Sequence, residues 1–160
     1  MTSDTSPAHQ SDRAWIALAQ ASIIVDQTLQ AARDRELPPM TVTVLDPGGR
    51  LVAAKREDNS SFFRGEISSA KAWGALAMGM PTRLLADRAA KAPDFTQSLT
   101  ALTQGRFIPV PGGVLIRDAQ GRLLGAVGVS GAHPDDDEAC ATVGVAAAGL
   151  VADIEGPPRK

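Results

Sequence analysis

The 160-residue chain contains no tyrosine, one cysteine and two histidines, and aromatic residues make up only 4% of it. A single cysteine excludes an internal disulfide. The first twelve residues, MTSDTSPAHQSD, lack the basic start and the apolar stretch of a secretory signal. We therefore expect the protein to be cytoplasmic.

The sequence also lacks a strong charge of either sign. Its formal net charge is −2 and it has no run of lysine or arginine, so it does not carry the positive field that nucleic acid or an anionic membrane would attract. No segment reaches the roughly 18 uncharged apolar residues that span a bilayer. We expect neither nucleic acid nor a membrane as a partner.

What the chain does have is a hydrophobic fraction of 44%, which is enough for the core of one domain at this length. The polar start and the proline-rich end, GPPRK, cannot continue a helix. We predict a single domain over residues 11–155, between flexible tails at residues 1–10 and 156–160.

The first third of the domain combines a helix with a hairpin. Apolar residues recur at helical spacing over residues 15–32, after Ser11 as a suitable N-cap. The period then changes to two over residues 41–45, and a second short strand over residues 50–56 follows a Pro-Gly turn. We predict a long first helix followed by a β-hairpin.

Two turns share one chemistry. DPGGRL at residues 46–51 and DAQGRL at residues 118–123 both place aspartate first and glycine fourth. This pattern suits an aspartate side chain that caps its own turn and a glycine with positive φ. We interpret it as two solutions to the same turn problem and predict a second hairpin at the second site.

The remaining elements complete an α+β pattern. Helical pieces are predicted over residues 65–78 and 82–90, followed by a short helix capped by Asp94. The apolar run at residues 122–130 indicates a strand in the middle of the sheet. A final helix over residues 134–154 is apolar nearly all round, so we expect the sheet on one side of it and another subunit on the other. Strands grouped as hairpins favour an antiparallel sheet.

The stretch GAVGVSGAHPDDDEACATVG at residues 125–144 brings three aspartates close to a histidine and the cysteine. Its GxxGxxG spacing fits neither the dinucleotide fingerprint nor the P-loop, and the acids already compensate the helix N-terminus that would bind a phosphate. Consecutive helical side chains diverge by about 100°, so Asp135–Asp137 cannot converge on one metal ion, and we expect no metal site. The pattern is typical of a helix start, with His133 near the N-cap.

Four segments together resemble the GlcG/HbpS-like haem-binding family, which includes the C-terminal domain of PduO-type proteins. They are VLDPGGRLVA, SSAKAWGA, PVPGGVLIRD with the following QGRLLGAVGVSG, and DDDEACATVG. The resemblance runs from about Ala14 to Ala152. It implies an α+β fold, an antiparallel sheet of about five strands flanked by helices, similar to profilin-like and PAS-like folds. It also implies homo-oligomers that bind haem or a corrinoid.

The same resemblance implies a set of site residues. The family's S-x-x-K-A lysine matches Lys71, its double glycine matches Gly112 and Gly113, its strand end matches Val129-Ser130-Gly131, and its helix-start acid matches Asp137. If the protein is an enzyme, Lys71 and Asp137 are the expected catalytic residues.

Lys71 lies in a predicted helix of otherwise small and apolar residues. Either its aliphatic stem packs on the core and its ammonium reaches water, or its amine binds a ligand. Gly112 and Gly113 allow a tight bend and could offer N–H groups to an anion. A haem would need an axial His, Cys, Met, Tyr or Lys. Besides His9 near the N-terminus, this leaves His133 and Lys71 as candidates.

Three hypotheses follow. The first is a protein that binds a small-molecule ligand, haem or another tetrapyrrole, through Lys71, Gly112, Gly113, Ser130, Gly131 and His133. The second is an enzyme of small-carboxylate catabolism, a tautomerase, lyase or hydrolase, that uses Lys71 in a pocket with Gly112, Gly113 and Asp137. The third is a non-catalytic oligomeric accessory subunit.

Overall fold

Residues 15–156, which the computed structural model describes, form an antiparallel five-stranded sheet with helices on both faces. The helices are α1 (Leu18–Asp34), α2 (Arg64–Met78), α3 (Thr82–Lys91), α4 (Pro93–Leu102) and α5 (Pro134–Ala147). The strands are β1 (Thr41–Leu45), β2 (Leu51–Arg56), β3 (Gly113–Arg117), β4 (Leu123–Ser130) and β5 (Val151–Asp153), in the order β2-β1-β4-β3-β5. The predicted α+β fold is confirmed.

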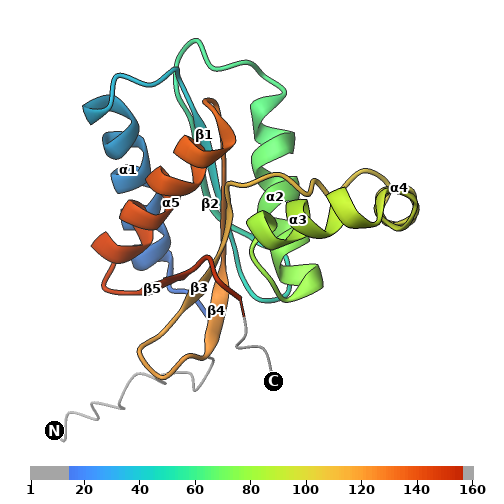
Figure 1. The fold of residues 1–160 in the computed structure, drawn as a ribbon. Coiled ribbons are helices and arrows are strands. Elements are labelled where there is room, and N and C mark those ends of the chain that lie inside the picture. Colours follow the sequence, from blue (N-terminus) through green and yellow to red (C-terminus); the bar gives the residue numbers. More distant parts are fainter. Residues whose placement is uncertain (1–14, 157–160) are drawn as a thin grey trace, which may run out of the picture.

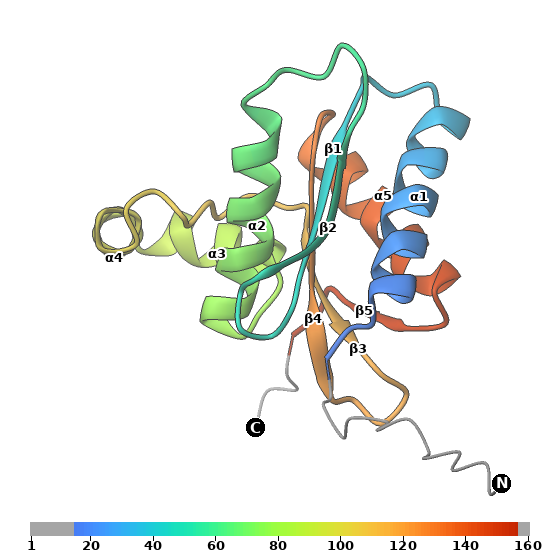
Figure 2. The same cartoon turned by 180° about the vertical axis from the view of Figure 1, so that it is seen from behind.

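The helices divide unequally between the two faces of the sheet. Helices α1 and α5 lie side by side on one face, and α2 lies on the other (Figures 1 and 2). Helices α3 and α4 extend from the α2 side away from the sheet, and α4 has no buried residue. The two faces therefore have separate cores.

Strand β4 lies in the middle of the sheet, as its nearly uninterrupted apolar sequence predicts. It pairs with β1 on one side and β3 on the other, and Ala126, Val127 and Val129 are fully buried. Val127 and Val129 join the larger core under α1 and α5, while Ala126 joins the smaller core under α2. A strand with apolar residues on both sides is covered on both faces, as predicted.

Both aspartate-capped turns form as predicted. Asp46 Oδ1 accepts hydrogen bonds from the N–H groups of Gly48 and Arg50, at 2.8 and 3.1 Å. Asp118 Oδ1 does the same for Gln120 and Arg122, at 2.9 Å each. The fourth residue of each turn is a glycine with φ near +75°, a conformation that suits glycine because it has no Cβ.

Glycines bring two helices unusually close to their neighbours. A Cβ on Gly128 of β4 would collide with the Ser68 carbonyl oxygen of α2, and one on Gly144 of α5 would collide with the Thr28 hydroxyl of α1. The close approach of α2 to β4 places the next turn of α2, which carries Lys71, against the end of β4.

Three details of the predicted elements are wrong. The first helix begins at Leu18, so Trp15 precedes it, and Ser11 lies outside the described residues. The cap of α4 is Ala92, because Pro93 takes the first helical position and moves Asp94 into the first turn.

The third correction concerns the C-terminal helix, which ends at Ala147 and not near residue 154. Gly149 adopts φ +73° and reverses the chain, and Val151–Asp153 then pair with β3 as an edge strand. One side of α5 packs on the sheet and a neighbouring side packs on α1, while Val143 of α5 is 42% exposed. The predicted contact of this helix with another subunit stays a prediction. The predicted tails fall on residues outside the described range, except Gly156.

Candidate functional site

Lys71 and Asp137 form an ion pair inside the protein. The Lys71 Nζ atom lies 2.9 Å from Asp137 Oδ2 and donates a second hydrogen bond to the Val129 carbonyl oxygen at 2.8 Å. Asp137 Oδ1 accepts from the Ala132 N–H at 2.9 Å. Lys71 is only 3% exposed and Asp137 only 1%. The pair joins α2, the end of β4 and the first turn of α5.

Gly112 completes this group. Its φ is +118°, and a Cβ there would lie 2.8 Å from Lys71 Nζ and 3.1 Å from the Asp137 Cβ. The position therefore excludes a side chain for conformational and steric reasons. Gly113 follows with its N–H donating to Thr82 Oγ1 at 2.8 Å, so this N–H is not available to an anion.

Burial dominates the electrostatics of the pair. Loss of hydration lowers the pKa of the Lys71 amine and raises the pKa of the Asp137 carboxyl. The attraction between the two groups opposes both shifts, and the nearby Arg64 guanidinium lowers the pKa of Lys71 further. Both charges have partners within the protein: each other, the Val129 carbonyl oxygen and the Ala132 N–H.

The other predicted residues lie around the pair in different environments. Ser130 is fully buried and its hydroxyl accepts from Arg64 Nη1 at 3.1 Å. Gly131 packs against the backbone of Pro39 and Met40. The His133 side chain is 70% exposed and caps α5 by accepting from the Asp135 N–H at 3.3 Å. The structure thus brings Lys71, Gly112 and Asp137 together and leaves the His133 imidazole in solvent.

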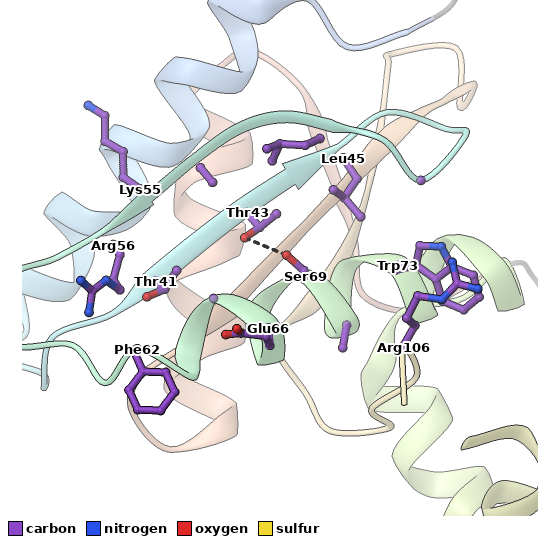
Figure 3. A pocket seen from close by; sticks show the side chains of 15 residues that line it. Thr41, Thr43, Leu45, Lys55, Arg56, Phe62, Glu66, Ser69, Trp73 and Arg106 are labelled. Carbon is purple, nitrogen blue, oxygen red and sulfur yellow. Dashed lines mark hydrogen bonds between the residues drawn. The ribbon is translucent and has the colours of Figure 1, made fainter. Parts of the chain in front are cut away.

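A separate cleft of about 760 Å³ lies between α2 and the hairpin of β1 and β2 (Figure 3). It is the feature that sequence reasoning missed. Its lining comes from β1, β2, the turn between them, α2 and two loops; the residues are Thr41, Thr43, Leu45, Gly49, Leu51, Ala54, Lys55, Arg56, Phe62, Gly65, Glu66, Ser69, Ala70, Trp73 and Arg106. A cavity of this size is within the usual range for small-molecule sites, about 300–1,000 Å³.

The two ends of the cleft have similar chemistry. Phe62 and Arg56 lie at one end, and Trp73 and Arg106 lie at the other, where the guanidinium carbon is 4.7 Å from the indole centroid (Figure 3). Within residues 15–156, neither arginine forms an ion pair with a carboxylate. Both ends therefore combine an aromatic side chain and an arginine in the lining, and at the Trp73 end the cation lies over the ring.

Hydroxyl groups of β1 and α2 line the cleft between these ends. Thr43 Oγ1 lies 2.8 Å from Ser68 Oγ and 3.5 Å from Ser69 Oγ, so these hydroxyls already have partners (Figure 3). Glu66 adds one carboxylate to the lining. In the sequence, the lining appears only as the alternation of Thr41, Thr43 and Leu45 and as a tryptophan two residues after Lys71, and neither feature by itself indicates a cleft.

The lining fits the ring and the carboxylates of a haem and does not fit axial ligation of its iron. Among residues 15–156, no histidine, cysteine or methionine lines the cleft, although these are the usual axial ligands besides tyrosine, which the chain lacks. The Lys55 amine points away from the cleft and is held 2.6 Å from Asp26 Oδ1 (Figure 3). No group of three or more His, Cys, Asp or Glu residues in the described part of the chain could hold a separate metal ion.

The chain is similar to one family model and to several solved structures. A family model described as haem degrading protein HbpS-like matches residues 16–146. Among solved structures, that of HbpS is 26% identical with a TM-score of 0.72, covering 88% of this chain and 95% of the other. Klebsiella pneumoniae protein ORFY is 24% identical with a TM-score of 0.72, covering 90% and 98%.

A third similar structure is a complex of PduOC with haem, 22% identical with a TM-score of 0.74, covering 85% of this chain and 96% of the other. At that identity the likeness establishes a shared fold. No curated protein sequence matches the chain significantly. Within residues 15–156, no helix has the length and apolar character needed to cross a membrane.

Proposed function

The chain belongs to the HbpS-like family, and on that premise we propose that it binds a small planar ligand, haem or another tetrapyrrole, in the cleft between α2 and the hairpin of β1 and β2. The observation that carries the proposal is the pair of arginines at the two ends of the cleft, Arg56 and Arg106, neither of which has a carboxylate partner in the described part of the chain. Arginine is the side chain best suited to bind a carboxylate.

The apolar part of the lining supports the same ligand class. Leu45, Leu51, Phe62 and Trp73 offer surfaces for the faces and edges of a flat, largely apolar ring. A ring stacked on an aromatic side chain gains energy beyond the area that it buries. A ligand with an apolar ring and acidic groups at its edge would use both kinds of surface.

The Lys71–Asp137 pair has a different role in this proposal. Because both groups are nearly fully buried and satisfied by protein partners, they do not reach the cleft lining. We assign them to holding α2 and α5 against β4, which positions the α2 side of the cleft.

The proposal is tested by titrating the full chain with haem and following the Soret band. We expect stoichiometric binding that weakens at least about tenfold when Arg56 and Arg106 are both replaced by glutamine, since each charge-assisted hydrogen bond contributes about 1.5–3 kcal/mol. Arg122→Gln is the matched control, because that arginine lies in the turn between β3 and β4, paired with Asp118. Equal affinities for the double variant and the control would reject the cleft as the site.

We also propose that the chain forms homo-oligomers. Helix α4 supports this, because Phe95 and Leu102 are 60% and 79% exposed on an element that projects from the rest of the domain. Exposed apolar side chains of this size mark contact surfaces. Analytical ultracentrifugation of the wild type and of a Phe95→Asp, Leu102→Asp variant tests the proposal. A monomeric wild type would reject oligomer formation, and an assembly that the two substitutions leave intact would reject α4 as its contact surface.

A further inference from the structure

We infer that the cleft recognises the ring face and the carboxylates of its ligand and not a metal at the ring's centre, so that metal-free porphyrins are ligands of this protein. The inference rests on the proposed function and names the ligand class more closely. It follows from which side chains the cleft contains and from what each of them can bind.

The cleft lining has few polar side-chain groups. They are hydroxyls, the Trp73 indole N–H, the Glu66 carboxylate and the cations of Lys55, Arg56 and Arg106. An ammonium or guanidinium group has no lone pair to offer a metal, and the Lys55 amine points away from the cleft towards Asp26. The hydroxyls of Thr43 and Ser69 are hydrogen-bonded within the protein. The lining therefore offers none of the strong haem ligands.

The chain has two histidines. The His133 imidazole caps α5 and is 70% exposed, and it is not part of the cleft lining. His9 lies outside the described residues and is addressed by the experiment. Cys140 is fully buried in the core under α1 and α5, so its sulfur cannot reach a ligand in the cleft.

The groups that can hold the ring lie at the two ends of the cleft. Gly49 allows the Trp73 indole to lie against the turn between β1 and β2, because a Cβ at this position would lie 3.0 Å from Trp73 Cδ1. Arg106 lies over the indole face at 4.7 Å. At the opposite end, the Arg56 guanidinium is oriented by a 2.8 Å hydrogen bond to the Ser60 carbonyl oxygen. Stacking and carboxylate binding act on parts of the ligand that are the same with and without iron.

The central experiment compares three ligands on the wild-type chain: haem, protoporphyrin IX without metal, and the dimethyl ester of protoporphyrin IX. We expect the dissociation constants of haem and protoporphyrin IX to agree within about threefold, and the ester, which has lost its carboxylates, to bind at least about tenfold more weakly. Absorbance and porphyrin fluorescence report the binding of each ligand.

The outcomes separate this inference from the proposed function. If neither haem nor protoporphyrin IX binds, the proposed function fails and the inference fails with it. If haem binds and protoporphyrin IX binds at least about tenfold more weakly, only the inference fails, because the metal then contributes the difference. An ester that binds as well as the free acid would also overturn it.

A second variant tests the same point from the protein side. In His9→Asn, His133→Asn the chain has no histidine left, and asparagine at position 133 preserves the cap of α5. We expect the haem affinity and the Soret maximum to be unchanged. A shift of the Soret maximum, or a loss of affinity of about tenfold or more for haem but not for protoporphyrin IX, would show histidine ligation and overturn the inference.

Discussion

At the scale of single residues, Lys71 and Asp137 carry opposite charges into the interior and satisfy each other there. Removing one partner leaves the other charge buried without compensation, which is far more costly than removing both. The arrangement therefore stabilises the fold only as a complete pair.

We expect Lys71→Met to lower the free energy of unfolding by about 3–5 kcal/mol. Adding Asp137→Asn should restore most of this loss, because the asparagine is neutral and its oxygen can still accept from the Ala132 N–H. Denaturant unfolding of the wild type, the two single variants and the double variant measures the coupling. A double variant as unstable as Lys71→Met alone would contradict this account.

Cys140 provides a second residue-scale prediction, on pH. Burial raises the pKa of its thiol above the ordinary value of 9.0. Above pH 9.0 the unfolded chain releases a proton that the folded chain keeps, so the stabilisation present below that pH is lost as the pH rises towards the folded-state pKa. The loss is at most about 1.4 kcal/mol per pH unit.

Cys140→Ala removes this dependence while leaving every other titrating group in place. The free energy of unfolding is measured for the wild type and for Cys140→Ala between pH 7 and pH 10.5. The difference between the two proteins should be constant below pH 9.0 and should shrink above it, as the wild type loses the contribution of the thiol. The slope is the readout, because the smaller side chain lowers stability equally at every pH. Parallel curves for the two proteins would refute the prediction.

At the scale of elements, glycine determines how closely the helices pack. Gly144 of α5 faces Thr28 and lies where a Cβ would come 2.6 Å from the Ile24 carbonyl oxygen of α1. Gly65 of α2 is also a helical glycine, but a Cβ added there would meet nothing within 4 Å. The two positions therefore form a matched pair.

We expect Gly144→Ala to destabilise the protein by about 1–3 kcal/mol, since α1 and α5 must separate. Gly65→Ala should stabilise it by up to about 1 kcal/mol, because alanine favours the helix and meets no obstacle. Thermal and denaturant unfolding of both variants check the prediction. Effects of the same sign would show that helix propensity, and not the contact with α1, controls position 144.

At the scale of the whole molecule, the cleft combines one carboxylate, Glu66, with two arginines that have no carboxylate partner within residues 15–156. For an anionic ligand this carboxylate is a repulsive neighbour. We expect Glu66→Gln to tighten haem binding by about fivefold, or about 1 kcal/mol, which is the interaction between two charges at about 4 Å in water. Salt should reduce the effect.

The control for Glu66→Gln is Asp87→Asn on α3, which removes the same charge from an exposed position outside the cleft lining. The two variants should differ in haem titrations at low ionic strength. If both tighten binding equally, net charge and not the local carboxylate is responsible, and Glu66 does not face the ligand.

How much of this could be predicted from the sequence depends on whether the signal is local. The capped turns at Asp46 and Asp118 were predictable because each is complete within six residues. The end of the last helix was missed because its alanine-rich pattern continues past Gly149, and only pairing with β3 selects the strand.

The candidate site shows the same division. That Lys71, Gly112 and Asp137 converge was implied by a resemblance, with support from a lone lysine in an apolar stretch. The cleft was not predicted, because Thr43, Trp73 and Arg106 come together only through the way in which α2 and the loop after α4 pack beside the hairpin. No short-range pattern encodes that packing.

The short strand β5 has a consequence for solubility during and after synthesis. Its residues occupy the outer side of β3, and Asp153 holds Arg117 across the pair at 2.7 Å. A chain truncated after Ala148 keeps all five helices of residues 15–156, but the outer edge of β3 then has unpaired backbone N–H and C=O groups. Such an edge can pair with a strand of another chain. Light scattering should show such a truncated chain self-associating, whereas one that ends at Gly156 stays clear.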